Sequence, residues 1–305
     1  MSGQRERTEV TVDGQRLTVS RLDKVLYPET GFTKGEVIDY YVKTAPYLLP
    51  HLAHRPVTRI RYPHGTGEKS FYEKNAPKGT PSWVRTENLP TPGSTKNRTS
   101  VDFVMVDAVA TLAWLGNLAA LELHIPQWRV ERRAEPRHPD RLVIDLDPGE
   151  GTGITECVEV ARLLRDRLAA DGLTAYPKSS GKKGIHLCCP IAAEQTDTTV
   201  SAYARRIAYT LSQEHPDLVT GNMRKVHRIG RVLIDWSQNN AAKTTVAPYS
   251  LRNHRAPTVS TPLAWDEMVP DLDGAFSPAE VMERLERHGD LWSPLLEPGP
   301  PVPNA

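Results

Sequence analysis

Strand and helix patterns alternate through the second half of this chain, and no other feature of the sequence constrains the fold as strongly. Two helical patterns occur at about 155–171 and 198–214. Beside them lie apolar runs that are typical of strands, at 141–146, 175–178, 185–189 and 232–236. This alternation predicts an α/β fold.

The first half adds a hairpin, a helix and an irregular segment. Residues 9–20 alternate apolar and polar side chains around an Asp-Gly pair, which predicts a β-hairpin. Thr33 and Glu36 form a capping box, so we expect a helix to begin there. Residues 75–100 are rich in Pro, Thr, Gly and Asn, and we expect them to be irregular.

The last part of the chain carries a second helix signal and a tail. Ser277 and Glu280 form another capping box with a proline at the first helical position, which predicts a helix over about 277–288. Residues 297–305 read EPGPPVPNA. Because proline and glycine dominate this stretch, we expect a disordered tail.

Composition places the chain among soluble globular proteins. Hydrophobic residues make up 39% and charged residues 25% of its 305 residues. No apolar run reaches the roughly 18 residues that a membrane span needs, and the polar N-terminus does not resemble a secretory signal. The three cysteines have neither metal-binding nor disulfide spacing. We therefore expect a cytoplasmic protein with no membrane partner and no structural zinc site.

Charge is distributed unevenly although the net charge is only +1. Residues 221–255 contain seven lysines and arginines against one acid, Asp235, a net charge of +6. Residues 262–297 contain nine acids against two arginines, a net charge of −7. A basic stretch around a single acid is typical of a site for a phosphate-rich ligand. The alternative is a solvated face that the acidic stretch balances.

Two carboxylates stand at the end of the apolar run 141–146. Because side chains alternate along a strand, Asp145 and Asp147 should point to the same face. Carboxylate oxygens are the ligands that Mg²⁺ and Mn²⁺ prefer, and a two-metal site needs a further acid. Asp235, which ends another apolar run, is the candidate. The alternative is a simple turn at Asp147, followed by Pro and Gly.

A turn rich in glycine, lysine and hydroxyl groups precedes the run 185–189. Its sequence is Ser180-Gly-Lys-Lys-Gly-Ile-His186. Glycines let backbone amides face a phosphate, and lysines supply positive charge, so this turn resembles a triphosphate cradle. Its spacing matches neither the P-loop nor the dinucleotide-binding pattern. The alternative is an exposed hairpin loop with a buried structural histidine.

Together these motifs resemble the polymerase domain of bacterial ligase D, a member of the archaeo-eukaryotic primase superfamily. The resemblance rests on RLVIDLDPGEG, SSGKKGIHL and VLIDWSQNNAAKTTVAPYSLR, and on DKVLYPETGFTK, FYEK and LELHIPQWR nearer the start. It covers nearly the whole chain. No ligase, nuclease or zinc module accompanies the matching segments, so we expect a stand-alone paralogue of that domain or the excised domain itself.

The resemblance implies a primase-like α/β (α+β) fold. We expect a single domain over 1–296, in which an N-terminal α/β unit of about 1–130 packs on an antiparallel sheet like that of RNA-recognition motifs. That sheet should lie in a catalytic unit of about 131–260 and carry the acids. The predicted helix at 277–288 and tail at 297–305 complete the chain.

The resemblance also implies roles for particular residues. Three acids match the metal-binding catalytic residues: Asp145, Asp147 and Asp235. Seven positions match residues around the incoming nucleotide, with the first near its sugar: His124, Ser180, Lys183, His186, Arg228, Lys243 and Arg252. Two lysines match the pair that holds a 5′-phosphate on the downstream DNA strand: Lys24 and Lys34. Phe71 and Tyr72 match the aromatic pair beside the template base, with Tyr72 in place of a second Phe.

The implied function is template-directed nucleotidyl transfer with two Mn²⁺ or Mg²⁺ ions and nucleoside triphosphates as substrates. The implied setting is gap filling and end extension during non-homologous end joining, with a preference for ribonucleotides. Expected partners are primed, gapped or broken DNA with a 5′-phosphate, the end-binding protein Ku and a DNA ligase, in the bacterial nucleoid. Two alternatives remain open: a non-catalytic scaffold that binds DNA ends, and a two-metal nuclease.

Overall fold

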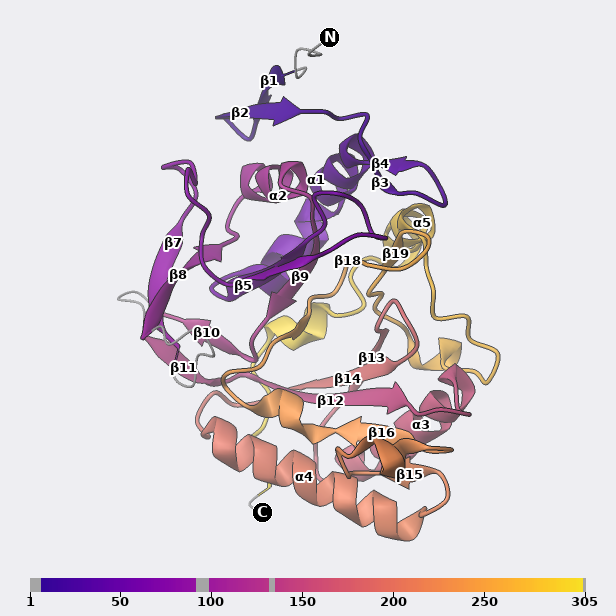
Figure 1. Ribbon diagram of the computed structural model, residues 1–305. Coiled ribbons are helices and arrows are strands. Elements are labelled where there is room, and N and C mark those ends of the chain that lie inside the picture. Colours follow the sequence, from indigo (N-terminus) through magenta and orange to yellow (C-terminus); the bar gives the residue numbers. More distant parts are fainter. Residues whose placement is uncertain (1–6, 92–98, 132–134, 304–305) are drawn as a thin grey trace.

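The computed structural model describes residues 7–91, 99–131 and 135–303. Two large β-sheets organise this part of the chain (Figure 1). The first is formed mostly by the N-terminal half and the second mostly by the C-terminal half. A β-hairpin precedes them, formed by β1 (Arg7–Val12) and β2 (Gln15–Ser20), with the expected Asp-Gly pair in its turn. The short antiparallel pair of β3 (Val25–Tyr27) and β4 (Phe32–Thr33) follows and leads into the first helix.

The first sheet has the strand order β17-β9-β5-β8-β7, with β6 also paired to β5. Its strands are β5 (Pro56–Arg61), β6 (Phe71–Glu73), β7 (Thr86–Pro90), β8 (Ser100–Met105), β9 (Ala120–Ile125) and β17 (Thr245–Val246). Helices α1 (Lys34–Leu52) and α2 (Val109–Asn117) pack against each other and share its hydrophobic core. The capping box of Thr33 and Glu36 begins α1 as predicted.

The second sheet has the strand order β13-β14-β12-β16-β15 and carries the predicted acids. Its strands are β12 (Arg141–Pro148), β13 (Tyr176–Ser179), β14 (Ile185–Pro190), β15 (Val219–Thr220) and β16 (Val232–Asp235). Neighbouring strands are antiparallel except for β15 and β16, which are parallel. The expected antiparallel sheet is therefore present, with one parallel pair at its edge.

Helices α3 (Ile154–Ala170) and α4 (Asp197–Glu214) cover one face of this sheet. Ile144 and Leu146 of β12 point into the core that these helices close. Because side chains alternate along a strand, Asp145 and Asp147 point to the opposite face, towards the first half of the molecule. The site thus lies between the two sheets.

After β16 the chain returns to the first half. β17 pairs with β9, and the pair of β18 (Leu251–Arg252) and β19 (Thr258–Val259) contributes to the first core, as does α5 (Pro278–His288). Smaller elements complete the described chain: β10 (Trp128–Val130), β11 (Pro136–Pro139), and the 3₁₀ turns η1 (Lys225–Arg228), η2 (Trp236–Asn239), η3 (Trp265–Glu267) and η4 (Ser293–Leu296).

The structure differs from two expectations. The segment 75–100 is not irregular throughout, because β7 pairs in register with β8; residues 92–98 of this segment lie outside the described residues. The described part of the tail, 297–303, is packed rather than disordered, while 304 and 305 are not described. Val302 is buried, and its backbone exchanges two hydrogen bonds with the side chain of Gln195. None of the described helices has the length and apolar character needed to cross a membrane.

Candidate active site

The three predicted acids converge on the face of the second sheet that points away from α3 and α4. Antiparallel pairing of β12 with β16 places Asp145 directly opposite Asp235, and Asp147 follows two residues along β12. Oxygen atoms of the three carboxylates lie within 4.8 Å of one another. The side chains of Asp145 and Asp235 are each 13% exposed, whereas Asp147 is exposed. Hydrogen-bonding register, rather than proximity in sequence, thus assembles the cluster.

Electrostatics make this cluster suitable for divalent cations. Burial raises the pKa of Asp145 well above its usual value, and the charges of Asp147 and Asp235 raise it further. Burial and the charge of Asp235 also raise the pKa of Asp147. Mutual repulsion among close carboxylates is relieved when a hard cation binds their oxygens. The residues present therefore fit a metal centre.

Asp235 is held in place by its own strand end. Its Oδ1 accepts hydrogen bonds from the backbone N–H (3.0 Å) and hydroxyl (2.5 Å) of Ser237, and its Oδ2 accepts one from Gln238 (2.9 Å). Lys243 donates to the Ser237 hydroxyl, and its Nζ lies 3.9 Å from Asp235 Oδ2. The predicted Lys243 is thus beside the acids.

The turn between β13 and β14 folds around Ser180. Its hydroxyl accepts hydrogen bonds from the backbone N–H groups of Lys182 (3.2 Å) and Gly184 (3.1 Å). A side chain at Gly184 would place its Cβ 2.3 Å from the carbonyl oxygen of Leu146, so only glycine lets the turn approach β12 this closely. Ser180 therefore shapes the predicted cradle from inside the turn.

A row of charged and polar side chains crosses the second sheet through the acids. Strand register aligns Lys178, His186, Asp145 and Asp235 on neighbouring strands. His186 Nε2 lies 3.2 Å from Asp145 Oδ1, and its buried Nδ1 has no hydrogen-bond partner among the described residues. Burial lowers the pKa of His186 well below its usual value, with a further contribution from Lys178. His186 is thus a neutral imidazole in contact with the acid cluster.

Lys178 is a site residue that the sequence interpretation missed. It is 1% exposed, donates to the Ser260 hydroxyl (2.5 Å) and lies over the Trp292 ring. Burial lowers its pKa to about 7. The sequence could have indicated Lys178 by its position on a predicted strand, two residues before Ser180. Once that strand pairs with the strand that contains His186, both side chains point to the same face of the sheet.

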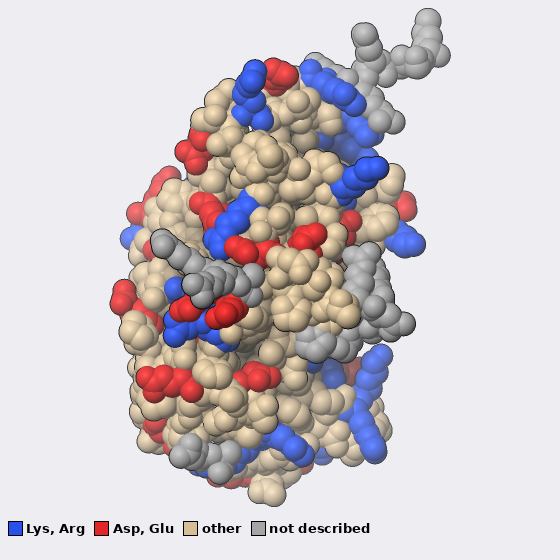
Figure 2. All heavy atoms as spheres, turned by 90° about the vertical axis from the view of Figure 1, so that its left-hand side faces the viewer, with Lys and Arg blue, Asp and Glu red and all other residues tan. Residues whose placement is uncertain are grey.

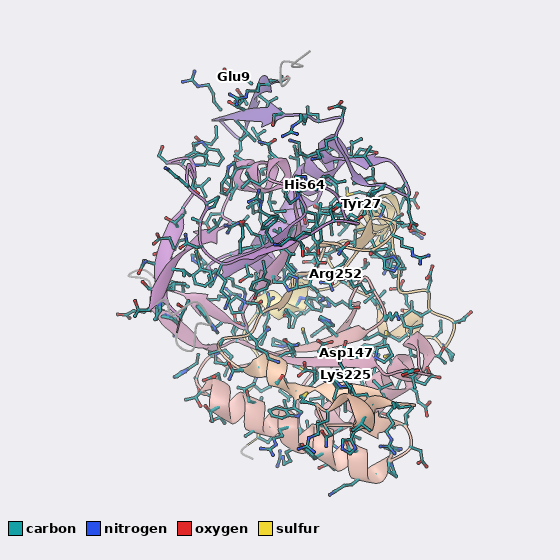
Figure 3. The ribbon with its side chains drawn as sticks, viewed as in Figure 1. Glu9, Tyr27, His64, Asp147, Lys225 and Arg252 are labelled. Carbon is teal, nitrogen blue, oxygen red and sulfur yellow. The ribbon has the colours of Figure 1, made fainter. Side chains whose placement is uncertain are left out.

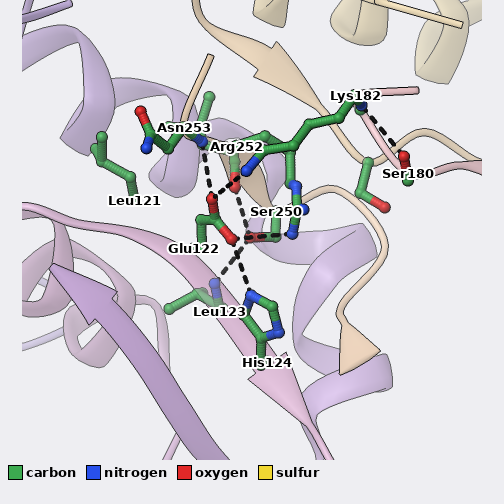
Figure 4. Close-up of polar contacts among 12 residues, drawn as sticks. Leu121, Glu122, Leu123, His124, Ser180, Lys182, Ser250, Arg252 and Asn253 are labelled. Atoms are coloured by element: carbon green, nitrogen blue, oxygen red, sulfur yellow. Dashed lines mark hydrogen bonds and ion pairs between the residues drawn. The ribbon is translucent and has the colours of Figure 1, made fainter. Parts of the chain in front are cut away.

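Glu122 of β9 was also missed, and it connects several predicted residues (Figure 4). Its Oε2 accepts hydrogen bonds from His124 Nε2 and Arg252 Nη1, both at 2.9 Å. Its Oε1 accepts one from the Asn253 backbone N–H (2.9 Å) and lies 3.5 Å from Lys182 Nζ. A charged residue within the apolar run LELHI was the signal available in the sequence. The structure thus ties Lys182, rather than the predicted Lys183, to this buried network.

The remaining basic residues occupy different environments. Figure 3 shows Arg252 between the two halves, with Asp147 on the sheet below it. Arg228, at the end of η1, donates to the carbonyl of Met223 (2.6 Å), and its charge opposes the upward pKa shift of Asp147. Lys183 is exposed on the turn, and no contact of its side chain is found among the described residues. The structure therefore brings Arg228 and Arg252 to the acids and leaves Lys183 facing solvent.

Lys24 and Lys34 lie together at the start of α1. The backbone N–H of Lys34 donates to the carbonyl of Lys24 (2.8 Å). Lys24 Nζ donates to the Pro63 carbonyl (2.5 Å), and Lys34 Nζ donates to Asn117 Oδ1 (3.0 Å). Burial lowers the pKa of Lys34 to about 8, and the positive charges of Arg21 and Lys24 contribute. This repulsion shows that cationic groups converge there.

Phe71 and Tyr72 are consecutive residues of β6 and are 40% and 54% exposed. Because successive side chains of a strand point to opposite faces, each ring has its own solvent-exposed surface, which an aromatic base can stack on. Tyr72 also lines a cavity of about 740 Å³ together with Phe103, Trp128 and Lys74. Figure 2 shows the face that carries β7, β8, β10 and β11, where acidic and basic side chains are interspersed. None of the three carboxylates lines this cavity.

Comparison with solved structures establishes the class of protein. The polymerase domain from Mycobacterium tuberculosis ligase D, solved in complex with DNA, superposes with a TM-score of 0.86 at 41% sequence identity. The match covers 94% of this chain and 100% of that one. The expected α/β fold is confirmed, and its class is that of primase-type polymerase domains.

Sequence comparison then gives the family. The family model described as LigD, primase-polymerase domain matches residues 33–292, and this chain belongs to that family. The multifunctional non-homologous end joining protein LigD of Mycolicibacterium smegmatis is 43% identical over 281 residues, 92% of this chain and 36% of the relative. The bifunctional LigD of Bacillus subtilis is 34% identical over 276 residues, 90% of this chain and 43% of the relative. The chain therefore spans less than half the length of each of these two proteins.

Proposed function

We propose that this chain is a template-directed polymerase that adds nucleotides to a primer 3′-hydroxyl. The observation that carries the proposal is the carboxylate cluster of Asp145, Asp147 and Asp235, set beside the turn at 180–184. In this reaction the 3′-hydroxyl loses its proton to solvent, its oxygen bonds to the α-phosphorus of the nucleotide, the bond from that phosphorus to the leaving oxygen breaks, and pyrophosphate departs.

The three carboxylates would hold two divalent ions, Mn²⁺ or Mg²⁺. When bound, such ions activate the attacking hydroxyl and neutralise charge on the triphosphate and the leaving oxygen. The protein itself holds the acids in register and supplies cations for the phosphates, among them Arg252, Arg228 and Lys243. Neutral His186 contacts Asp145 Oδ1 through Nε2 without adding charge beside the acids.

Two alternatives use the same fold. A two-metal nuclease would need the acids but no site for a triphosphate, and the Ser180 turn with its neighbouring cations favours the polymerase. A non-catalytic scaffold would have no need for the converged carboxylates. A primer-extension assay with purified protein, Mn²⁺, a primed template and one nucleotide separates the polymerase, the nuclease and the scaffold. Only the polymerase lengthens the primer.

We place this activity in the repair of double-strand breaks, with ribonucleotides as preferred substrates. The support is the family, together with relatives that are named non-homologous end joining proteins. Ku and a DNA ligase are the partners that such a role requires. We also propose that the described chain acts as one domain in the bacterial cytoplasm, close to the nucleoid.

We further propose that Lys24 and Lys34 hold the 5′-phosphate on the downstream side of a gap, and that Phe71 and Tyr72 stack beside the template base. The two lysines converge at the N-terminus of α1, where the helix dipole favours an anion. A terminal phosphate carries nearly two negative charges at neutral pH, so it should be preferred over an internal phosphate.

Replacing both lysines, Lys24→Ala with Lys34→Ala, should remove this preference. Charged hydrogen bonds contribute about 1.5–3 kcal/mol each, so affinity for gapped DNA with a 5′-phosphate should fall at least about tenfold. Affinity for the 5′-hydroxyl DNA and extension of a simple primed template should change little. Lys43→Ala is the matched control, since Lys43 is an exposed lysine of α1 that pairs with Asp39. If the double variant keeps the full preference, the anchor lies elsewhere.

The preference should also depend on pH. Lys34 has a pKa of about 8 and must be charged to bind the phosphate. The ratio of the affinities for 5′-phosphate and 5′-hydroxyl DNA should therefore be highest near pH 7 and fall as the pH rises through 8. Lys34→Arg keeps its charge in this range and should abolish the fall. A flat wild-type ratio between pH 7 and 9 would exclude Lys34 as the titrating anchor.

A further inference from the structure

The buried carboxylate of Glu122 determines which hydrogen bonds His124 can make. Glu122 is 2% exposed and lies between Arg252 and His124 (Figure 4). Although burial opposes it, hydrogen bonding from His124 and the charge of Arg252 lower the pKa of Glu122 to about 2. The carboxylate is thus ionised at neutral pH and can only accept hydrogen bonds. His124 Nε2, at 2.9 Å, must therefore carry the proton in this contact.

The other ring nitrogen of His124 follows from this constraint. Burial lowers the pKa of His124, although Glu122 opposes the shift, so the ring is neutral at neutral pH. A neutral imidazole with its proton on Nε2 has a lone pair on Nδ1 and acts there as an acceptor. No described residue donates to this Nδ1. The His124 side chain is 15% exposed, so this acceptor can be reached by a donor from a bound ligand.

Chemistry limits which part of a nucleotide can supply that donor. Ionised phosphates offer only acceptor oxygens and would repel the lone pair of Nδ1. Amino groups of the bases can donate, but they differ among the four bases, all of which a templated polymerase must accept. The sugar hydroxyls are donors that the four ribonucleotides share. A hydroxyl on the sugar is thus the group that suits His124 Nδ1 in every turnover.

We propose that Glu122 is a positioning residue that fixes the His124 tautomer, so that Nδ1 accepts a hydrogen bond from a sugar hydroxyl of the incoming nucleotide. This inference rests on the polymerase function proposed above, and its new element is the role of Glu122, because the family resemblance already implies that His124 lies near the nucleotide sugar. Glu122 does not touch the nucleotide and acts through His124. Glu122 also pairs with Arg252 and Lys182, cations that would serve the triphosphate, so the loss of these pairs should affect nucleotides of every sugar equally.

The test compares wild type with Glu122→Gln, in which an amide can donate to Nε2 and shift the proton to Nδ1. Single-nucleotide insertion is measured with a ribonucleotide, its 2′-deoxy analogue and its 3′-deoxy analogue. If E122Q binds the triphosphate more weakly, kcat/KM falls by the same factor for the ribonucleotide and for both deoxy analogues. The ratio of kcat/KM between the ribonucleotide and an analogue therefore does not change for this reason. A hydrogen bond contributes about 0.5–1.5 kcal/mol, so the wild-type preference for one hydroxyl should fall by up to about tenfold. The analogue whose ratio changes identifies the 2′- or 3′-hydroxyl.

The matched control is Glu267→Gln, which alters a carboxylate paired with Arg284 and should leave both ratios unchanged. Two outcomes overturn the inference but not the polymerase function. In the first, wild type is active but has no preference for nucleotides with either hydroxyl. In the second, E122Q is active and keeps the full wild-type preference. A wild type that inserts no nucleotide overturns the polymerase function, and the sugar ratios are then read from nucleotide dissociation constants.

A second measurement does not depend on catalysis or on the folding of E122Q. Nitrogen-15 NMR of histidine-labelled wild type, with His124 assigned through His124→Gln, reports which ring nitrogen carries the proton. We expect the Nε2–H form, with an Nδ1 shift that changes when a ribonucleotide binds. A proton on Nδ1 in the free protein, or an Nδ1 shift that ignores the nucleotide, would contradict the inference.

Discussion

Replacing Asp145 with asparagine is expected to abolish nucleotide incorporation, and Asp147→Asn and Asp235→Asn should do the same. Each change removes one of three carboxylates whose oxygens lie within 4.8 Å of one another. Loss of one preorganised charged group at a reacting centre costs on the order of 10²–10³-fold in kcat, and loss of a metal with it costs more. We therefore expect a decrease of about a thousandfold or greater in single-turnover insertion.

These variants should remain folded and should still bind DNA. Repulsion among the carboxylates raises the pKa values of Asp145 and Asp147, so removing either charge should leave the metal-free protein at least as stable as wild type. Asp235→Asn also loses the hydrogen bond that Asp235 Oδ2 accepts from Gln238, so a small loss of stability is expected for that variant. Thermal unfolding without metal, DNA affinity and Mn²⁺ affinity are measured beside incorporation. Near wild-type extension by any of the three variants would exclude the metal-centre interpretation.

Gly184→Ala is expected to have the second largest effect. The added Cβ would lie 2.3 Å from the Leu146 carbonyl oxygen and 3.7 Å from Asp147 Oδ1. Because the obstructing atom belongs to the backbone, β12 or the turn must move, and overpacking of this kind costs about 1–3 kcal/mol of stability. A displacement of about 1 Å at reacting groups can lower the rate about a hundredfold. We expect losses of this size in stability and in kcat/KM for nucleotide.

Gly67→Ala is the matched control for this substitution. A Cβ added at Gly67 would meet no atom within 4 Å beyond its chain neighbours, and Gly67, like Gly184, lies outside the left-handed backbone region. Thermal unfolding and incorporation kinetics of the two variants are compared under the same conditions. If G184A behaves like G67A, the close approach of the turn to the acids is not required for activity.

The sequence predicted those parts of the site that depend on local pattern. Alternation along one strand was enough to place Asp145 and Asp147 on a common face, and the structure confirms this on β12. The capping box of Thr33 and Glu36 likewise defined the start of α1. In both cases the interacting groups lie within a few residues of each other, so the local sequence pattern is enough to predict their relative positions.

Long-range pairing determined what the sequence alone could not predict. Asp235 faces Asp145 because β16 pairs with β12 in one register, and the sequence made Asp235 a candidate without revealing that pairing. Glu122 and Lys178 are buried charges whose partners come from distant segments, among them Arg252 and Ser260. Nothing near them in the chain reveals those partners, so neither could be selected beforehand.

Long-range contacts also explain why the tail is packed. Proline and glycine indicate disorder when a segment is considered alone, but the Gln195 side chain supplies two hydrogen bonds to Val302. Burial of the Val302 side chain adds hydrophobic stabilisation, worth up to about 1.5–3 kcal/mol for a fully buried residue of this type. Composition could not reveal this docking site on another part of the chain.

One measurement tests the central claim most directly. Purified protein is incubated with Mn²⁺, a labelled primer on a gapped template with a downstream 5′-phosphate, and the single nucleotide complementary to the gap. Wild type should lengthen the primer by that nucleotide and release one pyrophosphate for each addition, whereas D145N should do neither. A primer that is shortened, or that is bound without change by wild type, would contradict the assignment of a polymerase.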